Sequence, residues 1–182
     1  MKLLYISGSP RQDGNADYLL NVALSMTGGQ LVRVCDYRIE ACRACWACRK
    51  GGRCAIKDDM SETLTPMLLE CEGVVFGSPV FFNNVTAQLK ALIDRTWCLR
   101  GRLRNKLAGA IVVGRRYGAE GAITALNAFF LKHEMIVANR GVCGLAYGKG
   151  EVAEDLEAVE AARRLGERIL ELGVLLQGRS EG

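Results

Sequence analysis

Short, continuously apolar segments alternate along this chain with longer segments whose apolar residues recur every three to four positions. The short segments have the length and composition of strands buried on both faces of a sheet. The longer segments have the periodicity of helices that bury one face. The predicted strands span residues 2–7, 31–35, 73–77, 107–113 and 135–142, and the predicted helices span residues 15–26, 61–70, 85–99, 121–131 and 152–176.

Strands that alternate with helices indicate a parallel sheet covered by helices on both faces. About five strands in 182 residues predict an α/β fold, a flavodoxin-like doubly wound sheet of five parallel strands. Such sheets bind ligands at the carboxyl ends of their strands. We therefore expect function in the loops that follow the first, third and fourth strands. The stripe of the last helix that is expected to face the sheet comprises Val152, Leu156, Val159 and Ile169.

Composition bounds the class of protein. Hydrophobic residues make up 49% and charged residues 24%, as in soluble folded proteins, so we expect one domain over residues 1–177 with a flexible tail at 178–182. No apolar run approaches the roughly 18 residues of a membrane span, and the apolar start is too short for a signal peptide. A cytoplasmic location is expected. The net charge of +4 without a basic stripe argues against nucleic-acid binding and fits small anionic ligands.

The loop after the first strand, residues 7–16, has the features of a phosphate site. Its small residues let the backbone curl around a ligand, and the following helix offers unpaired N–H groups. Ser9, Arg11 and Asn15 supply a hydroxyl, a guanidinium and an amide. The alternative is a turn in which Asn15 merely caps the helix. The loop matches neither the dinucleotide fingerprint nor the P-loop, which argues against an NAD-anchored dehydrogenase and an ATPase.

The loop after the third strand places two adjacent aromatic residues, Phe81 and Phe82, where solvent is expected. A flat aromatic ligand or a partner subunit explains such exposure, and the alternative is packing beneath the loop. Asn83 and Asn84 offer hydrogen bonds to a polar ring edge. The loop after the fourth strand, residues 114–118, completes the rim. In it, Arg115 or Arg116 either meets a ligand oxygen or stays solvated.

Eight cysteines are the outlying feature of the composition. Four lie within thirteen residues at the spacing C-x-x-C-x-x-C-x-x-x-x-x-C, and four thiolates match the ligand set of one [4Fe–4S] cluster. A structural zinc site and a set of free or disulfide-forming thiols stay open as alternatives. The four are Cys42, Cys45, Cys48 and Cys54, whereas small core hydrophobes are expected at Cys35, Cys71, Cys98 and Cys143.

Three stretches together resemble the NADPH-dependent FMN reductase family of flavodoxin-like fold: residues 8–11 with Asn15, residues 77–82 and residues 87–95. The resemblance runs from about residue 2 to residue 147. It implies that the first loop holds the FMN phosphate, that the third-strand loop lines the isoalloxazine ring and that the fourth-strand loop borders its far edge. The implied FMN residues are Ser9, Pro10, Arg11, Gly14, Asn15, Ala16, Pro79, Val80, Phe81, Phe82, Asn83, Asn84, Gly114, Arg115 and Gly118.

The cysteine segment, followed by Asp58-Asp59-Met60, is similar to the compact motif of iron–sulfur flavoproteins, a branch of that family. This resemblance implies a cluster loop over about residues 40–57 after the second strand, and a homodimer or homotetramer in which FMN and the cluster exchange electrons. A redox partner protein or NAD(P)H is the implied electron source. No catalytic residue is expected beyond the cofactors. His133, the only histidine, is expected at the surface or capping a helix.

Three hypotheses follow for the function. The first is an iron–sulfur flavoprotein that passes electrons between a [4Fe–4S] cluster and FMN. The second is a cluster-free NAD(P)H-dependent FMN or quinone reductase, and the third is a flavodoxin-like electron carrier with structural zinc. The cysteine spacing favours the first over the second. The positive net charge counts against the third, because electron-carrier flavodoxins are usually acidic.

Overall fold

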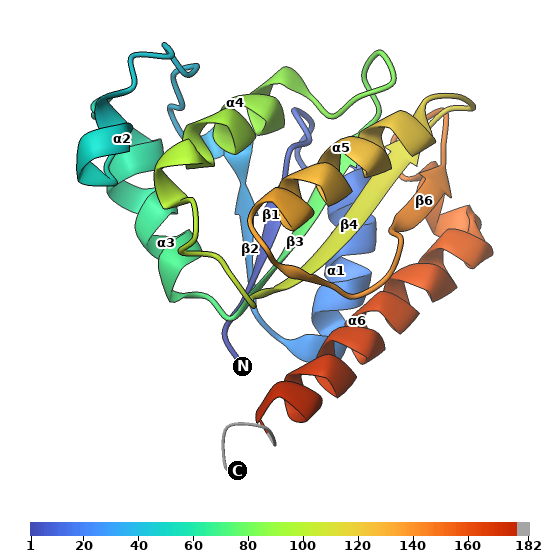
Figure 1. Cartoon of the computed structure of the whole chain (residues 1–182). Helices are drawn as coiled ribbons and strands as arrows, with labels where there is room; N and C mark the ends of the chain where they lie inside the picture. Colours follow the sequence, from blue (N-terminus) through green and yellow to red (C-terminus); the bar gives the residue numbers. More distant parts are fainter. Residues whose placement is uncertain (178–182) are drawn as a thin grey trace.

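The computed structural model describes residues 1–177, and the predicted tail at 178–182 lies outside this range. Strands and helices alternate along the chain (Figure 1). The strands are β1 (Leu3–Ser7), β2 (Gln30–Arg33), β3 (Gly73–Pro79), β4 (Leu107–Gly114), β5 (Ile136–Val137) and β6 (Val142–Leu145). The helices are α1 (Asn15–Thr27), α2 (Ala47–Gly51), α3 (Thr65–Glu70), α4 (Ala87–Arg95), α5 (Ala119–Lys132) and α6 (Leu156–Gln177).

The sheet has the strand order β2-β1-β3-β4-β5, and every pairing in it is parallel. The predicted doubly wound parallel sheet is therefore confirmed. The fifth strand differs from the prediction, because two short strands share the place beside β4. β5 pairs with the start of β4, the chain then leaves the sheet, and β6 pairs with the end of β4. The break falls at the polar segment Asn139-Arg140-Gly141, whose glycine has a φ of 117°.

Helices cover both faces of the sheet, and β1 explains the continuous apolar runs of the sequence. Leu4 and Ile6 belong to the core on one face, whereas Leu3 and Tyr5 belong to the core on the other. Successive strand residues point to opposite faces, so both sets must be apolar. Helices α1 and α6 lie on one face, and α3, α4 and α5 on the other (Figure 1).

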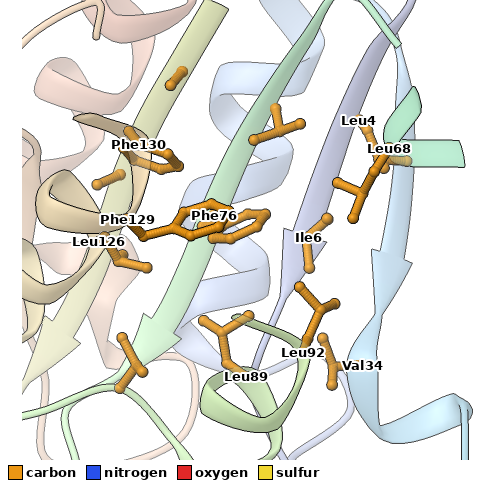
Figure 2. Close-up of a cluster of buried hydrophobic side chains, with 14 of the residues drawn as sticks. Leu4, Ile6, Val34, Leu68, Phe76, Leu89, Leu92, Leu126, Phe129 and Phe130 are labelled. Atoms are coloured by element: carbon orange, nitrogen blue, oxygen red, sulfur yellow. The ribbon is translucent and has the colours of Figure 1, made fainter. Parts of the chain in front are cut away.

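Stacked aromatic rings fill the centre of the α5 side of the sheet (Figure 2). Phe76 on β3 lies with its ring centroid 5.2 Å from that of Phe129 and 5.6 Å from that of Phe130. Each ring buries a large apolar area, and offset ring contacts add to the stabilisation. This packing fixes β3 and β4 beneath α5, and so fixes where their carboxyl ends open.

Several helix predictions need correction. In α6 the inward-facing residues include Ala158, Ala162, Leu165 and Ile169, whereas Leu156 is 75% exposed. The predicted helix 61–70 begins with a wide π-helical turn at Met60–Leu64 before α3. The predicted helix 85–99 is α4 followed by a 3-10 turn at Thr96–Leu99. No helix within residues 1–177 is long and apolar enough to cross a membrane.

Two of the four cysteines predicted to be core residues are correctly placed. Cys71 and Cys98 are buried, but Cys35 and Cys143 are exposed. The expectation of a surface position for His133 is also wrong in part: the residue caps the end of α5, yet it is buried. Its Nε2 lies 3.0 Å from Thr96 Oγ1, and burial lowers its pKa.

Candidate functional site

The loop after β1 is held in its curl by a buried carboxylate. Asp17, 2% exposed in the first turn of α1, accepts a hydrogen bond from Ser7 Oγ and another, 3.1 Å long, from the N–H of Gly14. Arg33 Nε lies 3.5 Å from the same carboxylate. These contacts join the end of β1 to the start of α1 and leave the residues between them, 10–13, exposed at the sheet edge.

Two predicted ligand groups in this loop are engaged within the protein. Ser9 Oγ donates to the carbonyl of Arg11 at 2.9 Å. Asn15 Nδ2 donates to the carbonyl of Gly148 at 2.7 Å, and Asn15 Oδ1 accepts from the N–H of Gly150 at 2.7 Å. Gly14 is the N-cap residue of α1, so Asn15 is a tether to residues 147–150 and not the helix cap. The Arg11 side chain is left exposed, and the first N–H groups of α1 have no partner within the helix.

The loops after β1 and β3 lie side by side. The N–H of Gly8 donates to the carbonyl of Gly77 at 2.8 Å, and Thr86 Oγ1, which caps α4, donates to the carbonyl of Gly8 at 2.7 Å. A Cβ on Gly8 would lie 2.7 Å from Leu89 Cβ, so only glycine permits this approach. The predicted phosphate loop and aromatic loop are thus brought together at one edge of the sheet.

The aromatic loop is a tight turn that presents its rings to solvent. Phe81 and Asn84 exchange backbone hydrogen bonds of 2.8 and 3.0 Å, and Phe82 and Asn83 adopt positive φ angles of 48° and 60°. Phe82 is fully exposed and Phe81 is 48% exposed. The alternative that both rings pack beneath the loop is therefore wrong. A bulky residue held at positive φ stores backbone strain, which occurs most often at functional sites.

The loop after β4 closes against the aromatic loop through Asn83. Gly118 has a φ of 85°, and a Cβ there would lie 2.8 Å from Asn83 Cα. Tyr117, beside it, is 77% exposed. Arg115 is exposed and attracts Glu151, whose pKa is lowered first by the N–H groups of Gly148 and Tyr147. The loops after β1, β3, β4 and β6 thus form one rim.

Sequence reasoning missed the contribution of residues 147–150 to this rim. They follow β6, and they receive both polar atoms of the Asn15 side chain. The signal available in the sequence was Gly148-Lys149-Gly150, a small and basic run between a strand and the last helix. The predicted fifth strand ends at residue 142, whereas β6 ends at Leu145, so the sequence pattern does not place this run at the rim.

The cysteine segment forms a loop that contains a single short helix, α2. Ala44 and Trp46 have positive φ angles of 50° and 57°, and Gly52 ends α2 in the left-handed conformation. Cys42 and Cys45 are exposed, whereas Cys48 and Cys54 are half-buried. One cavity of about 320 Å³ is lined by all four predicted ligands, Cys42, Cys45, Cys48 and Cys54, together with Trp46, Ile56, Arg95, Trp97 and Cys98.

The four cysteines line one cavity, but they do not form a metal-binding group. Within residues 1–177, no group of three or more His, Cys, Asp or Glu side chains is close enough to hold a metal ion. Cys98 is a fifth cysteine at the same cavity, which sequence reasoning treated only as a core residue. Burial, and then the nearby Cys54 and Cys48 sulfurs, raise the pKa of its thiol.

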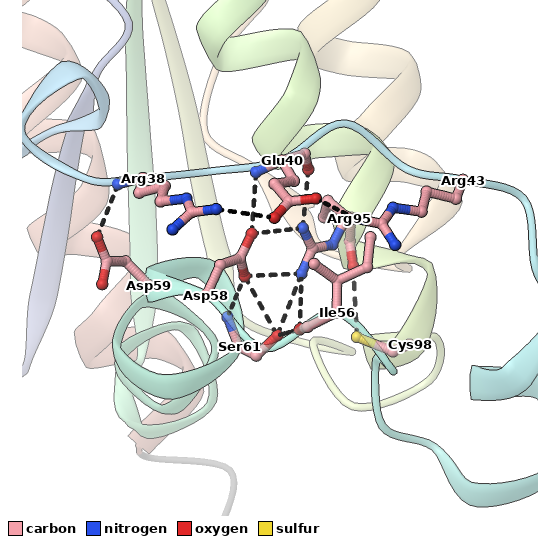
Figure 3. A network of polar contacts seen from close by, with 9 residues as sticks. All are labelled: Arg38, Glu40, Arg43, Ile56, Asp58, Asp59, Ser61, Arg95 and Cys98. Carbon is pink, nitrogen blue, oxygen red and sulfur yellow. Dashed lines mark hydrogen bonds and ion pairs between the residues drawn. The ribbon is translucent and has the colours of Figure 1, made fainter.

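A buried ion pair closes the base of the cysteine loop (Figure 3). Arg95 at the end of α4 and Asp58 after the loop are paired at 2.7 Å, with both side chains fully buried. Burial alone would raise the Asp58 pKa, but hydrogen bonds from Arg95 and from the N–H of Glu40 hold it at about 2. The carboxylate is therefore charged at neutral pH and binds the guanidinium firmly.

An aromatic pair covers the outer side of the cavity. Trp46 meets Trp97 edge to face at 6.1 Å, and the Arg100 guanidinium lies 4.9 Å from the Trp97 ring centre. Trp46 is 59% exposed and Trp97 is 37% exposed. Neither tryptophan is a core residue, and both line the cavity together with the four cysteines.

Comparison with known proteins gives consistent matches. The model of the NADPH-dependent FMN reductase family matches residues 1–150. An iron–sulfur flavoprotein of Methanocaldococcus jannaschii is 38% identical over 193 aligned residues, covering 97% of this chain and 100% of that protein. An iron–sulfur flavoprotein of Methanosarcina thermophila is 32% identical, covering 97% of each.

Solved structures share the fold at low identity. RosB with a bound 8-demethyl-8-formylriboflavin-5′-phosphate has a TM-score of 0.80 at 17% identity, covering 98% of this chain and 81% of its own. A flavodoxin from the domain Archaea has a TM-score of 0.60 at 15% identity, covering 94% and 97%. These matches establish a flavodoxin-like fold for residues 1–177.

Proposed function

The chain belongs to the NADPH-dependent FMN reductase family, and from this premise we propose that it is an iron–sulfur flavoprotein that passes electrons between FMN and a [4Fe–4S] cluster. Its membership makes it an oxidoreductase of flavodoxin-like fold. The observation that carries the cluster part of the proposal is the single cavity lined by Cys42, Cys45, Cys48 and Cys54.

The residues at the sheet edge fit FMN. The phosphate would lie at the start of α1, beside the exposed Arg11 and the first N–H groups of the helix, which have no partner within the helix. Phe81, Phe82 and Tyr117 would border the isoalloxazine ring. The mononucleotide is favoured over FAD because the chain has no dinucleotide loop. Ser9 and Asn15 would act on the phosphate indirectly, by shaping the loop through the contacts that they make within the protein.

The cysteine loop fits a four-iron cluster. Each iron of such a cluster takes one thiolate, so the ligands stand around an inorganic core, as do the four thiols around this cavity. One buried N–H at the cavity, Arg95 Nε, has no hydrogen-bond partner within the described residues. Four cations on or beside the loop would offset the negative charge of the ligated cluster, namely Arg43, Arg49, Lys50 and Arg53.

When bound, FMN supplies exchange of electron pairs and the cluster supplies exchange of single electrons. The chain's own residues position these groups and set their surroundings. The buried Asp17 holds the phosphate loop, Asn83 joins the loops after β3 and β4, and the Arg95–Asp58 pair holds the base of the cysteine loop.

Assembly into a homodimer or homotetramer belongs to the same proposal. Phe82, Tyr117 and Trp46 are large apolar side chains that stand exposed around the two sites. A second copy would cover them, and closed symmetric assembly is the usual solution for a chain of one domain. The electron source would be NAD(P)H or a redox partner protein. Sedimentation of the protein with its cofactors bound tests the assembly, and a monomer would refute it.

Anaerobic purification followed by iron, sulfide, zinc and flavin analysis tests the function. We expect about one FMN, four irons and four sulfides per chain, which corresponds to one cluster per flavin. Cys45→Ser and Cys48→Ser should each abolish iron–sulfur absorbance and the reduced-cluster EPR signal while FMN stays bound. Cys35→Ser, an exposed cysteine outside the cavity, is the control and should keep both.

Zinc without iron in the wild-type protein would contradict the cluster. The cluster-free NAD(P)H-dependent FMN reductase would then be the better supported function. A relative of Bacillus subtilis, 25% identical over 177 residues, is described as a putative NAD(P)H-dependent FMN-containing oxidoreductase.

A further inference from the structure

Arg95 is a fully buried arginine that joins one helix to both ends of the cysteine loop. Its Nη1 donates to the carbonyl of Glu40 and to Asp58 Oδ2, both at 2.7 Å. Its Nη2 donates to Asp58 Oδ1 at 2.8 Å and to the carbonyl of Ile56 at 3.3 Å, and it also lies 3.1 Å from Ser61 Oγ. Figure 3 shows these contacts converging on one guanidinium.

The positions of these partners in the chain explain what the contacts do. Glu40 precedes the first of the four cysteines, and Ile56 follows the last. The N–H of Glu40 also donates to Asp58 at 2.9 Å. The guanidinium and the carboxylate therefore close the loop at its base. The two ends of the cysteine loop cannot separate without exposing the buried ion pair to solvent or separating its two charges.

One N–H of Arg95 is unaccounted for. Arginine has five N–H donors, and the four on the terminal nitrogens are used by the contacts above. The fifth, on Nε, is buried and has no partner within residues 1–177. A buried donor without a partner is costly, and such groups are rare in folded proteins unless a ligand satisfies them.

The surroundings of Arg95 indicate which ligand would satisfy it. Arg95 lines the same cavity as the four cysteines. Cys54 lines this cavity two positions before Ile56, whose carbonyl accepts from Arg95 Nη2 at 3.3 Å. A thiolate or a cluster sulfide is a strong acceptor for such a cationic donor.

We propose that Arg95 is a positioning residue for the iron–sulfur centre, which closes the base of the cysteine loop through its terminal nitrogens and donates its Nε–H to the Cys54 sulfur. This inference rests on the proposed function. The hydrogen bond stabilises the reduced cluster more than the oxidised one, because the reduced cluster carries one more negative charge. Arg95 thereby raises the reduction potential of the cluster.

The first test uses the wild-type holoprotein. The protein is produced with arginine that carries ¹⁵N in its guanidino group. Its cluster is then reduced, and pulsed EPR is used to detect coupling between the reduced cluster and a ¹⁵N nucleus. We expect a coupling from Nε that disappears in Arg95→Lys. A cluster without any ¹⁵N coupling in the wild-type protein, or a coupling that persists in Arg95→Lys, would overturn the proposal. The absence of coupling in the wild-type spectrum is enough to refute the proposal, so the test does not depend on whether the variant folds.

The second test measures the reduction potential. Arg95→Lys keeps the positive charge but lacks the Nε–H, so we expect the reduced cluster to be disfavoured about tenfold, a shift of about 59 mV to more negative potential. Arg38→Lys is the matched control, because Arg38 lies just before the loop, does not line the cavity and has a side chain that is 80% exposed. It should leave the potential unchanged. Equal potentials in the two variants would refute the hydrogen bond.

Hydrogen exchange of residues 40–57 tests the closing role. Arg95→Lys should speed exchange in this segment, whereas Arg38→Lys should not, since the Arg95 side chain binds the carbonyls of both Glu40 and Ile56 and the Arg38 side chain binds neither. Loss of iron from Arg95→Lys alone would support the same role. Metal analysis separates this inference from the proposed function: wild-type protein that holds zinc and no iron contradicts the function, whereas a cluster indifferent to Arg95 contradicts only the inference.

Discussion

Asn15 holds Gly148 by a hydrogen bond of 2.7 Å from its side-chain amide, across 133 positions of sequence. The same side chain accepts from the N–H of Gly150, so its two polar atoms join the start of α1 to the loop after β6. This relationship makes the rim of the proposed flavin site one connected structure. It also means that a residue suited to phosphate contact serves the site by holding a neighbouring loop.

Asn15→Ala should weaken FMN binding without loss of the fold. It removes two hydrogen bonds, each of which contributes about 1 kcal/mol, and part of that loss should appear in binding, at about tenfold in Kd. Fluorescence titration of the flavin-free protein measures the change. Asn127→Ala is the control, since Asn127 also donates to a distant carbonyl, that of Arg140, at 2.9 Å. Equal FMN affinities in the two variants would contradict the role given to Asn15.

Arg11→Ala should weaken FMN binding about tenfold but leave riboflavin binding unchanged, because only FMN carries the phosphate that the guanidinium would meet. The effect should shrink as salt concentration rises, since Arg11 is exposed. Titration with both flavins at two salt concentrations measures this. Arg168→Ala on α6 changes the same charge far from the loop and serves as the control. An equal loss for riboflavin would place Arg11 elsewhere than at the phosphate.

Cys98→Ala should retain the iron–sulfur centre, whereas Cys54→Ala should lose it. Both sulfurs line the same cavity, but Cys98 is buried within the core and lies outside the four-cysteine segment. Iron content and the EPR signal of the reduced protein distinguish the two variants. Iron lost from Cys98→Ala and kept in Cys54→Ala would mean that the ligand set includes the fifth cysteine in place of the fourth.

Gly118→Ala should destabilise the protein by more than the positive φ alone costs. Gly118 has a φ of 85°, and an added Cβ would also overlap Asn83. Gly101→Ala is the matched control, because Gly101 has a φ of 79° with nothing within 4 Å of the added carbon. Backbone strain alone is about 1 kcal/mol. Thermal unfolding should therefore show the larger loss at Gly118, and equal losses would mean that the two loops are not in contact there.

The stability of the protein should depend on pH through His133. Burial lowers the pKa of this residue in the folded protein, so the unfolded chain binds more protons than the folded protein does as pH falls below about 6.5. The contribution of His133 to the free energy of unfolding is fully present above that pH and is lost as pH falls toward the folded pKa. The thermal midpoint of the wild type should drop between pH 7.5 and 5.5 on the order of a few degrees relative to His133→Asn. Parallel pH profiles for the two proteins would contradict this.

Much of the fold could be predicted from the sequence because its signals are local. In β1, adjacent residues such as Leu4 and Tyr5 are both apolar, which is enough to indicate a strand buried on both faces. The fifth strand was misplaced because the stretch from Met135 to Val142 contains Asn139 and Gly141, whose turn breaks it in two. Leu156 was assigned to the buried stripe because periodicity alone does not say where a helix begins.

The candidate site divides in the same way. The donor set of the cysteine loop was determined by the sequence itself, because four cysteines within thirteen residues belong to one loop. Only the tertiary structure brought Arg95 to the base of that loop, across 37 positions from Asp58, and Cys98 to the same cavity. A local pattern records which side of a helix or strand is buried. The partner that a buried charge finds depends on segments that meet only when the chain is folded, and burial makes that pairing obligatory.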